Sequence, residues 1–310
     1  MPKPVAVILL NWNTPVYTAN CITSLKRYCD ERLFDIIIAD NGSTDGSLTL
    51  LQTQFPDLIY IDNHENLGFA EGNNRGLNYS IDKGYTYSLL INTDTLVDED
   101  IVTKLSTHLN NYPEAAAVQP AIYWMHDRAK IWNGKGGFNR VLGLIYSERK
   151  LPAQNDTDTF KAAQWVTGCC MLTRNSALIK CGLFNPKFFL YYEDVDLSFM
   201  IREMGYELHY LPSCKMYHEA GVSGKAEVKG KEGILSPVIH YYVSRNRLWV
   251  LRKYGNKLCY PIYIIISGFY YISLLIYFKL RGRNKKAGYL IKGLKDGLFT
   301  PKNLIWPINK

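Results

Sequence analysis

Residues 87–95 change abruptly from apolar to polar. We predict a buried strand over residues 88–91, because its apolar residues run together and a polar cluster ends them. Asn92, Thr93 and Asp94 follow this strand. Ligands of open α/β sheets bind outside the carboxyl ends of the strands, where a carboxylate can hold a divalent cation beside a diphosphate. An Asn-x-Asp triplet is more often only a turn or a helix N-cap, so its context decides.

Short strands and helices alternate over the first hundred residues. The expected strands cover residues 5–10, 34–40, 58–61 and 88–91. Three helices are expected: one over residues 17–28, one that follows the turn at residues 40–45 and continues through Leu51, and one from residue 66 through Leu77. This alternation predicts a doubly wound parallel sheet, with a nucleotide site where the polar loops after the strands meet. No G-x-G-x-x-G follows the first strand and no P-loop motif occurs, which excludes those two kinds of nucleotide site.

The second half of the chain has a less regular pattern. The expected elements are a helix over 98–109, a strand over 115–119, a hairpin or mobile loop region over 122–162, a strand over 165–173, a short helix over 176–181 and a strand over 206–211. Gly168 falls inside one of these strands. Glycine within a strand often marks close approach of a ligand or of another backbone.

Two adjacent acids, Glu193 and Asp194, follow an aromatic run at the start of a predicted helix over residues 194–204. Carboxylates at a helix N-terminus are stabilised by free N–H groups, so a purely structural role is one interpretation. A general base in a dry cleft is the other, because paired acids raise each other's pKa. His218 follows the strand predicted to end at residue 211, and it is either a packing residue or a metal ligand.

Charge and cysteine content indicate the surroundings of the protein. The seven cysteines are odd in number and form no C-x-x-C pair, which is typical of buried thiols in a reducing compartment. Residues 245–310 contain 14 Lys or Arg and one acid, so the net charge of +8 divides into +13 on this tail and −5 on residues 1–244. A basic tail indicates an anionic partner, either nucleic acid or lipid.

Residues 258–278 carry no charge and are long enough to cross a bilayer. Basic residues flank both ends, which disfavours crossing, so we predict a helix or helical hairpin lying in the cytoplasmic leaflet. A true span and a buried soluble helix stay open as alternatives. Residues 287–298 predict a short amphipathic helix. The uncharged, tyrosine-rich run favours lipid over nucleic acid as the partner, and the lack of a signal peptide predicts that the catalytic part lies in the cytosol.

Together these segments resemble inverting nucleotide-sugar glycosyltransferases of family 2, which have the GT-A fold, and most of all their rhamnosyltransferase-like branch. The resemblance covers about residues 4–250. Its elements, in order, are residues 11–13 (N-W-N), 40–45 (D-N-G-S-T-D), 66–70 (N-L-G-F-A), 92–94 (N-T-D), 165–168 (W-V-T-G), 189–196 (F-L-Y-Y-E-D-V-D), Arg202, His218 and residues 242–246 (Y-V-S-R-N).

The resemblance implies an α/β chain with a Rossmann-like, mostly parallel central sheet, flanking helices and a helical, membrane-associated tail. It implies a glycosyltransferase domain over residues 1–250, with a nucleotide-binding half (1–97) and an acceptor-binding half (98–250), followed by the tail (251–310). The implied activity is that of an inverting hexosyltransferase in cell-surface polysaccharide synthesis. Its partners would be a nucleotide-sugar donor, a glycan or lipid-linked acceptor and the cytoplasmic leaflet of the cell membrane, but not nucleic acid.

The resemblance also implies roles for single residues. Asp194 would be the catalytic base, Asp94 and His218 would bind Mn²⁺ or Mg²⁺, and Trp165, Gly168 and Glu193 would lie on the acceptor side. The implied donor-binding residues are Asn11, Asn13, Asp40, Asn41, Gly68, Asn73, Asn92 and Asp94.

Two positions depart from the wider family. Asn92 replaces the first acid of the D-x-D motif, and Asn73 replaces the usual arginine of A-R-N-x-G. Both departures fit the rhamnosyltransferase-like branch, for which dTDP-rhamnose is the donor by analogy, while glucose, galactose and N-acetylated sugars stay open. A non-catalytic nucleotide-sugar or lipid-binding scaffold is the alternative function. The presence of Asp94, Asp194 and His218 together argues against it.

Overall fold

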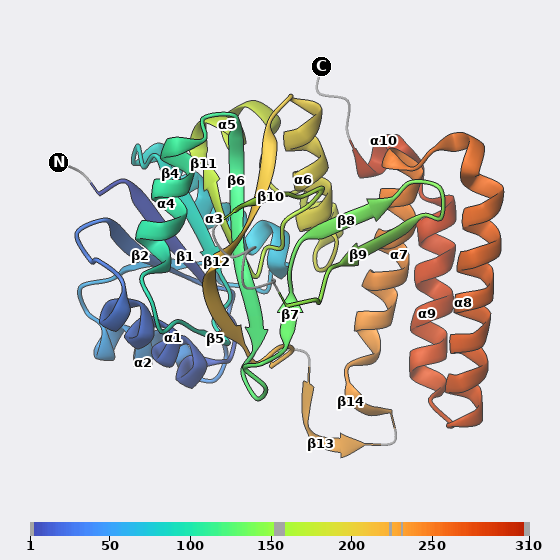
Figure 1. Ribbon diagram of the computed structural model, residues 1–310. Coiled ribbons are helices and arrows are strands. Elements are labelled where there is room, and N and C mark those ends of the chain that lie inside the picture. Colours follow the sequence, from blue (N-terminus) through green and yellow to red (C-terminus); the bar gives the residue numbers. More distant parts are fainter. Residues whose placement is uncertain (1–2, 152–158, 223–224, 231, 307–310) are drawn as a thin grey trace. The chain divides into compact units, whose positions relative to one another are not determined.

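The computed structural model of the protein describes residues 3–151, 159–222, 225–230 and 232–306. Its first half contains four parallel strands, which lie in the order β4-β1-β2-β3. They are β1 (Val5–Asn11), β2 (Phe34–Asp40), β3 (Ile59–Asp62) and β4 (Tyr87–Ile91). The parallel sheet predicted from the alternating strands and helices is therefore confirmed (Figure 1). Because the strands share one direction, their polar carboxyl ends meet at one edge.

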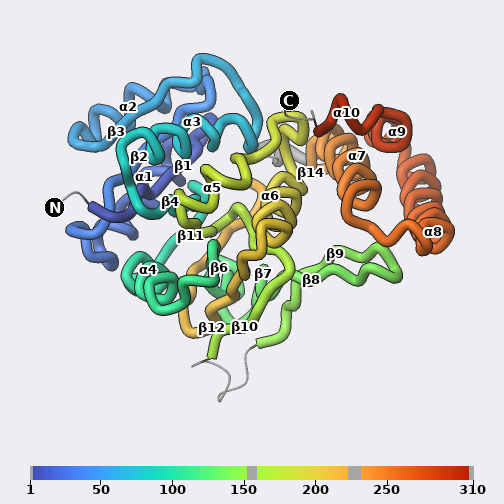
Figure 2. Tube along the Cα trace, turned by 90° about the horizontal axis from the view of Figure 1, so that it is seen from above, coloured from blue at the N-terminus to red at the C-terminus, as the bar shows by residue number. Residues whose placement is uncertain are grey.

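The other half of this sheet is mixed. The strand β11 (Cys170–Arg174) lies antiparallel between β4 and β6 (Ala115–Trp124), and β12 (Glu207–His218) runs parallel to β6. Figure 2 shows β1, β4 and β11 side by side. The short strands β5 (Thr95–Leu96), β7 (Ile131–Asn133) and β10 (Lys161–Ala162) extend the sheet.

Two strand predictions need correction. The strand predicted over residues 165–173 begins only at Cys170, because the preceding N–H groups donate to side chains instead of to a neighbouring strand. The strand predicted over residues 206–211 continues to His218 through a register shift between Leu211 and Lys215. Of the two alternatives predicted for residues 122–162, the hairpin is confirmed, because β8 (Gly136–Asn139) pairs with β9 (Leu144–Ser147). The same region also contains β7 and β10. Residues 152–158 lie outside the described residues.

Helices cover both faces of the sheet. Alternate residues of β1 point to opposite faces, so that Val5, Val7 and Leu9 join one apolar cluster and Ala6 and Ile8 join the other. The first cluster includes residues of α1 (Pro15–Tyr28), α2 (Ser47–Gln54) and α4 (Ile101–Asn111). The second includes residues of α3 (Gly68–Asp82), α5 (Asn175–Cys181) and α6 (Glu193–Glu203).

The chain divides into two compact units. The first comprises Met1–Gly137, Ser147–Phe184 and Asp194–Ser223, and the second comprises Phe138–Tyr146, Asn185–Glu193 and Gly224–Lys310. The boundary predicted at residue 250 falls inside α7 and stays a prediction. The second unit contains η2 (Pro186–Phe188), β13 (Lys225–Gly230), β14 (Gly233–Leu235), α7 (Pro237–Tyr254), η3 (Lys257–Cys259), α8 (Tyr260–Leu280), α9 (Asn284–Phe299) and α10 (Lys302–Ile305).

Close packing of α9 on α7 is possible because Gly293 has no side chain. A Cβ at this residue would lie 2.2 Å from Ser244 Oγ and 2.5 Å from the carbonyl oxygen of Tyr241. Gly297, one turn further along α9, would bring a Cβ to 2.8 Å from Leu248 Cδ1. The two glycines therefore allow the backbones of α7 and α9 to approach closely.

We expect Gly293→Ala to destabilise the second unit, because α9 must move away from α7 to admit the methyl group. Overpacking of this kind costs about 1–3 kcal/mol, and the midpoint of urea-induced unfolding of the full chain measures it. Gly288→Ala is the matched control in the same helix, since a Cβ there meets nothing within 4 Å. Its stability should be equal or slightly higher, because alanine favours helix. Equal destabilisation by both variants would contradict this account of the packing.

Candidate functional site

The ends of β1 and β2 are joined by buried polar side chains. Asn11 Nδ2 donates to Asp40 Oδ2 at 2.7 Å and to Ser43 Oγ at 3.1 Å. The other oxygen of Asp40 accepts from the backbone N–H of Ser43 at 2.8 Å. Asn13 ties the same loops together, because its N–H donates to Ser43 Oγ and its Oδ1 accepts from the N–H of Thr44. Asn11, Asn13 and Asp40 are therefore brought together as the sequence predicted.

Asn41 shapes the next loop. Its Oδ1 accepts from the N–H of Leu67 at 3.1 Å, and its Nδ2 donates to Asn66 Oδ1 and to the carbonyl of Gly68. The loop that opens α3 is thus held against the end of β2. Asn73 lies further along α3, and its amide donates to the carbonyl of Phe69 in the same helix. Asn41 and Gly68 therefore have structural tasks in the loop, whatever else they contact.

Asp94 and His218 form a buried pair. Thr95 in β5 lies opposite His218 in β12, which places His218 Nε2 3.0 Å from Asp94 Oδ1. The second oxygen of Asp94 accepts from the backbone N–H of Val222 at 3.4 Å. Burial opposes ionisation of Asp94, but the hydrogen bond with His218 and the charge of His218 outweigh it, so that the pKa of the carboxyl is lowered.

These two side chains fit a divalent cation. They offer a carboxylate oxygen and an imidazole nitrogen 3.0 Å apart. Carboxylate oxygen is a usual ligand of Mn²⁺ and Mg²⁺, and imidazole is a common metal ligand that the oxygen-preferring Mg²⁺ seldom takes. His218 Nδ1 is buried and has no hydrogen-bond partner among the described residues, while the ring of Trp132 packs edge-on at 4.2 Å. Because a carboxylate only accepts, His218 Nε2 carries the proton of the hydrogen bond to Asp94, and an ion held by both side chains would replace that proton.

Asp194 lies at the segment that precedes β11. Its Oδ2 accepts from the N–H of Gly168 at 3.0 Å, and its Oδ1 accepts from the N–H of Val195 at 2.8 Å. Burial raises the pKa of the Asp194 carboxyl, and these hydrogen bonds only partly oppose the effect. A Cβ at Gly168 would lie 2.9 Å from the ring of Phe69, which explains a glycine at this position.

One short segment connects Asp194 with the pair at Asp94. The N–H of Asn92 donates to the carbonyl of Cys169 at 2.9 Å, directly after Gly168. The charges of Asp94 and Asp194 both add to the effect of burial in raising the pKa of the Cys169 thiol. Asp94 and His218 therefore meet where β4 and β12 end, and Asp194 contacts the segment that is bonded to the end of β4.

The other predicted acceptor-side residues lie as follows. Trp165 is buried, and its Nε1 donates to the carbonyl of Gly137 at 3.2 Å. Glu193 is buried at the start of α6 and belongs to the second unit. Sequence reasoning missed Gln119, whose Oε1 accepts from the N–H of Thr167 at 2.8 Å and whose Nε2 donates to the carbonyl of Gly134. The available signal was a long polar side chain inside a predicted strand.

A second group of possible ligands lies at the opposite end of β12. Carboxylate oxygens of Glu114 and Glu207 and a ring nitrogen of His209 lie within 4.8 Å of one another. His209 already has a partner at each nitrogen, namely His108 Nε2 at 2.8 Å and Glu207 Oε2 at 2.9 Å. Burial and the neighbouring His209 lower the pKa of His108 to about 4. A hydrogen-bonded chain accounts for this cluster without an ion.

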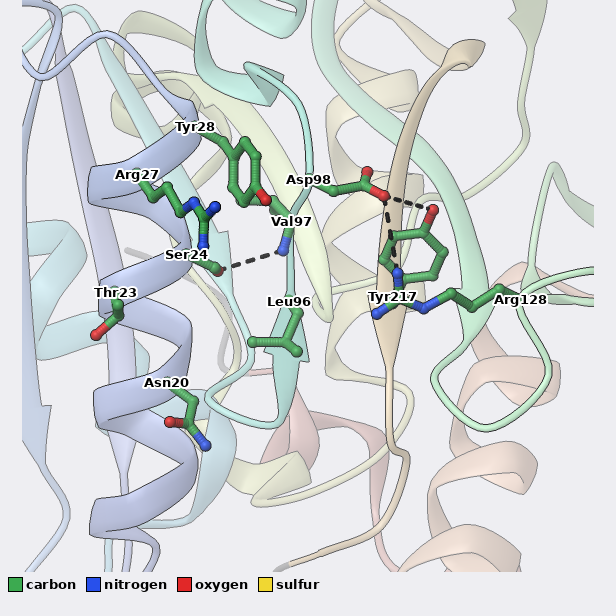
Figure 3. A pocket seen from close by; sticks show the side chains of 10 residues that line it. All are labelled: Asn20, Thr23, Ser24, Arg27, Tyr28, Leu96, Val97, Asp98, Arg128 and Tyr217. Atoms are coloured by element: carbon green, nitrogen blue, oxygen red, sulfur yellow. Dashed lines mark hydrogen bonds and ion pairs between the residues drawn. The ribbon is translucent and has the colours of Figure 1, made fainter.

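A cavity of about 290 Å³ lies between α1 and the β5–β12 ribbon (Figure 3). Tyr217 lines it, and its hydroxyl donates to Asp98 Oδ2 at 2.9 Å while Arg128 stacks over its ring. Tyr217 precedes His218 in β12, so the two side chains leave opposite faces of the strand. The cavity is therefore separate from the pair of Asp94 and His218.

Comparisons with known proteins show the family of the chain. The sequence profile described as Glycosyl transferase family 2 matches residues 6–182. N-acetylglucosaminyl-diphospho-decaprenol L-rhamnosyltransferase of Mycobacterium tuberculosis is 26% identical over 244 residues, covering 73% of this chain and 79% of the relative. The dTDP-rhamnosyl transferase RfbF of Shigella flexneri is 23% identical over 283 residues and covers 89% of both chains.

Among solved structures, mannosyltransferase PcManGT from Pyrobaculum calidifontis, in complex with GDP-Man and Mn²⁺, is similar with a TM-score of 0.54 and 15% identity. The match covers 96% of this chain and 89% of that one. At this identity the likeness supports the fold alone.

Proposed function

Because the chain belongs to glycosyl transferase family 2, we propose that this glycosyltransferase moves a sugar from a nucleoside diphosphate to a hydroxyl of a glycan or lipid-linked acceptor, with inversion. The observation that carries the proposal is the convergence of Asp94, His218 and Asp194 on the segment around Gly168 and Cys169. A scaffold without activity has no need for the buried pair of Asp94 and His218, nor for a second carboxylate, Asp194, with a pKa that is raised by burial.

Asp194 would take the proton of the acceptor hydroxyl. The acceptor oxygen then forms a bond to the anomeric carbon, the bond from that carbon to the phosphate oxygen breaks, and the nucleoside diphosphate leaves with the electron pair. Attack from the side opposite the diphosphate inverts the anomeric centre. A base whose pKa is raised toward neutrality takes a proton more readily while still ionised at working pH, which suits Asp194 to this task.

Asp94 and His218 would hold Mn²⁺ or Mg²⁺. A divalent cation bound there would offset the charge that develops on the leaving diphosphate. The two side chains provide fewer negative charges than a complete D-x-D motif, because residue 92 is asparagine.

Rhamnose is the proposed sugar. Two relatives at 26% and 23% identity are named as rhamnosyl transferases, one of them with dTDP in its name. Asn92 and Asn73 also depart from the wider family in the way that the rhamnosyltransferase-like branch does. The acceptor of the mycobacterial relative is named as a diphospho-decaprenol, which supports a lipid-linked acceptor for this chain.

The proposed membrane contact is supported by the polarity of α8. One helix of the part that the structure describes, Lys257–Leu280, is long and apolar enough to cross a membrane by length and composition. Its protein-facing side carries hydroxyls, since Tyr263, Ser267 and Tyr271 are buried. The opposite side is apolar and exposed, with Ile265 at 70% and Phe269 at 78%. This arrangement is the reverse of a soluble helix, and it fits a lipid surface.

Basic residues occupy the ends of α8 and the start of α9. They are Lys257, Lys279, Arg281, Arg283 and Lys285, whereas Lys286 is buried. Such residues attract anionic lipid head groups. We therefore propose that the second unit lies on the cytoplasmic leaflet, near a lipid-linked acceptor.

A panel of nucleotide sugars tests the activity directly. The full chain with Mn²⁺ should release nucleoside diphosphate from one donor when acceptor lipid is present, and dTDP-rhamnose is the expected donor. Release of nucleoside diphosphate from a different donor would show that rhamnose is the wrong sugar. No release from any donor would favour the non-catalytic scaffold.

Asp94→Asn should weaken binding of Mn²⁺ by about tenfold or more, because the site loses its negative ligand. Isothermal titration of the metal alone into the full chain measures this. Glu207→Gln is the control, since it removes an acid from the second group of possible ligands, Glu114, Glu207 and His209, at the opposite end of β12. An unchanged affinity in Asp94→Asn with a loss in Glu207→Gln would place the ion at the opposite end of β12.

Asp194→Asn should lower kcat for transfer by about 10²–10⁴-fold while donor binding stays within a factor of about two. Glu203→Gln, at the exposed far end of α6, is the matched control and should retain activity. Normal transfer by Asp194→Asn would remove this residue as the base.

The rate of sugar transfer should depend on pH through the ionisation of the Asp194 carboxyl. Because burial raises the pKa of Asp194, the base is ionised above that pKa and transfer is lost as the pH falls through it. The acidic limb of the profile of kcat/KM should therefore lie above the ordinary range for aspartate. An acidic limb at the usual pKa near 3.9 would contradict the assignment.

Flotation with vesicles tests the membrane contact. The full chain should float with vesicles rich in phosphatidylglycerol, and the double variant Ile265→Glu/Phe269→Glu should not. Ile179→Glu is the matched control, because this residue is 64% exposed on α5 of the first unit. Equal flotation of both variants would defeat the proposal. Deleting the tail is a poorer test, because α9 packs on α7 and its loss would expose that helix.

A further inference from the structure

The loop before Glu193 has an unusual backbone. Phe189, Tyr191 and Tyr192 have φ values of 64°, 69° and 68°. Bulky residues other than glycine rarely adopt this left-handed region. Such conformations persist only where the surrounding structure holds them, and they gather at functional sites. Three of them within four residues therefore need an external restraint.

Two neighbouring residues of α7 supply the restraint. The Nδ2 amide of Asn246 lies 2.9 Å from the carbonyl of Phe188, 2.9 Å from that of Leu190 and 2.7 Å from that of Tyr191. Arg245 Nη2 donates to the carbonyls of Lys187 and Phe188 at 2.8 Å and 2.9 Å. Both the loop and α7 belong to the second unit.

The donors are themselves fixed in orientation. Arg245 Nε donates to Asn246 Oδ1 at 2.8 Å, which turns the amide nitrogen of Asn246 toward the loop. The guanidinium of Arg245 lies over the ring of Trp249 at 4.2 Å. Asn246 is 0% exposed, so losing its amide would remove the donor to the carbonyls of Leu190 and Tyr191, whereas the carbonyl of Phe188 keeps the donor of Arg245.

The aromatic side chains of the loop pack on the same helix. Phe189 stacks on Tyr242 with ring centroids 5.0 Å apart, and Phe188 meets Trp249 edge-on at 5.6 Å. The loop is thus held both by its carbonyls and by its rings. It ends at Glu193, and the next residue of the chain is Asp194.

We propose that Arg245 and Asn246 are positioning residues, which hold the aromatic loop in its strained conformation so that α6 begins with Asp194 correctly placed. The inference rests on the proposed function of Asp194 as base. Residues 242–246 belong to the segments that resemble the family but have no assigned role, and this restraint supplies one. A loop that only closed a gap in the chain would have no need of three left-handed aromatic residues.

Asn246→Ala tests the proposal. We expect kcat for sugar transfer to fall by about tenfold to a hundredfold, because misplacement of a catalytic group by about 1 Å costs that much, while KM for the nucleotide sugar changes less than about twofold. Ser244→Ala is the matched control, since Ser244 is buried in the same helix but donates only to carbonyls of α7. It should keep kcat. A variant Asn246→Ala with unchanged kcat would overturn the proposal.

Two further measurements distinguish a loss of kcat that comes from misfolding from a loss that comes from misplacement of Asp194. Arg245→Lys keeps the charge but loses the forked donors, and it should show the same fall in kcat with an unchanged unfolding midpoint. The double variant Asp194→Asn/Asn246→Ala should be no slower than Asp194→Asn, because the two residues act through one group. An independent, multiplicative loss in the double variant would refute a role through Asp194.

Hydrogen exchange keeps the inference testable if the proposed activity fails. Amides of residues 188–192 should exchange faster in Asn246→Ala than in Ser244→Ala. Faster exchange with no sugar transfer by the wild-type chain would uphold the restraint and reject the proposed function. Unchanged exchange would reject the restraint, whatever the activity.

Discussion

Three consecutive N–H groups, those of Val166, Thr167 and Gly168, donate to side chains rather than to a neighbouring strand. Their acceptors are Ser198 and Asp194 of α6 and Gln119 of β6. Buried N–H groups must find partners, so these bonds decide where β11 starts. They also bring Asp194 to the segment that Asn92 contacts on its other side. The candidate site therefore depends on an interruption of the sheet as much as on the sheet itself.

The parallel half of the fold could be predicted because its signals are local. In β1, β2 and β4 an apolar run ends in polar residues, and the period of two shows in the alternate packing of Val7 and Ile8. The polar ends then meet because parallel strands point the same way. Asn11 and Asp40 lie opposite each other in the register, at the points where the two predicted polar loops begin.

The remainder could not be predicted, because it depends on contacts between distant residues. Pro212 interrupts the strand pattern after Leu211. The strand β12 nevertheless continues, because it pairs with β6 both before and after the register shift between Leu211 and Lys215. His218 reaches Asp94 only through that continuation. The close approach of α9 to α7 at Gly293 depends in the same way on which faces meet, and a helical period of apolar residues does not specify the partner helix.

Cys169 lies beside both carboxylates, and its thiol stays protonated because burial and the two negative charges raise its pKa well above the usual value. Metal coordination by cysteine requires the thiolate. The surroundings of Asp94 therefore offer oxygen and nitrogen but no soft sulfur anion. Alkylating reagents, which react with the thiolate, should therefore modify Cys169 slowly.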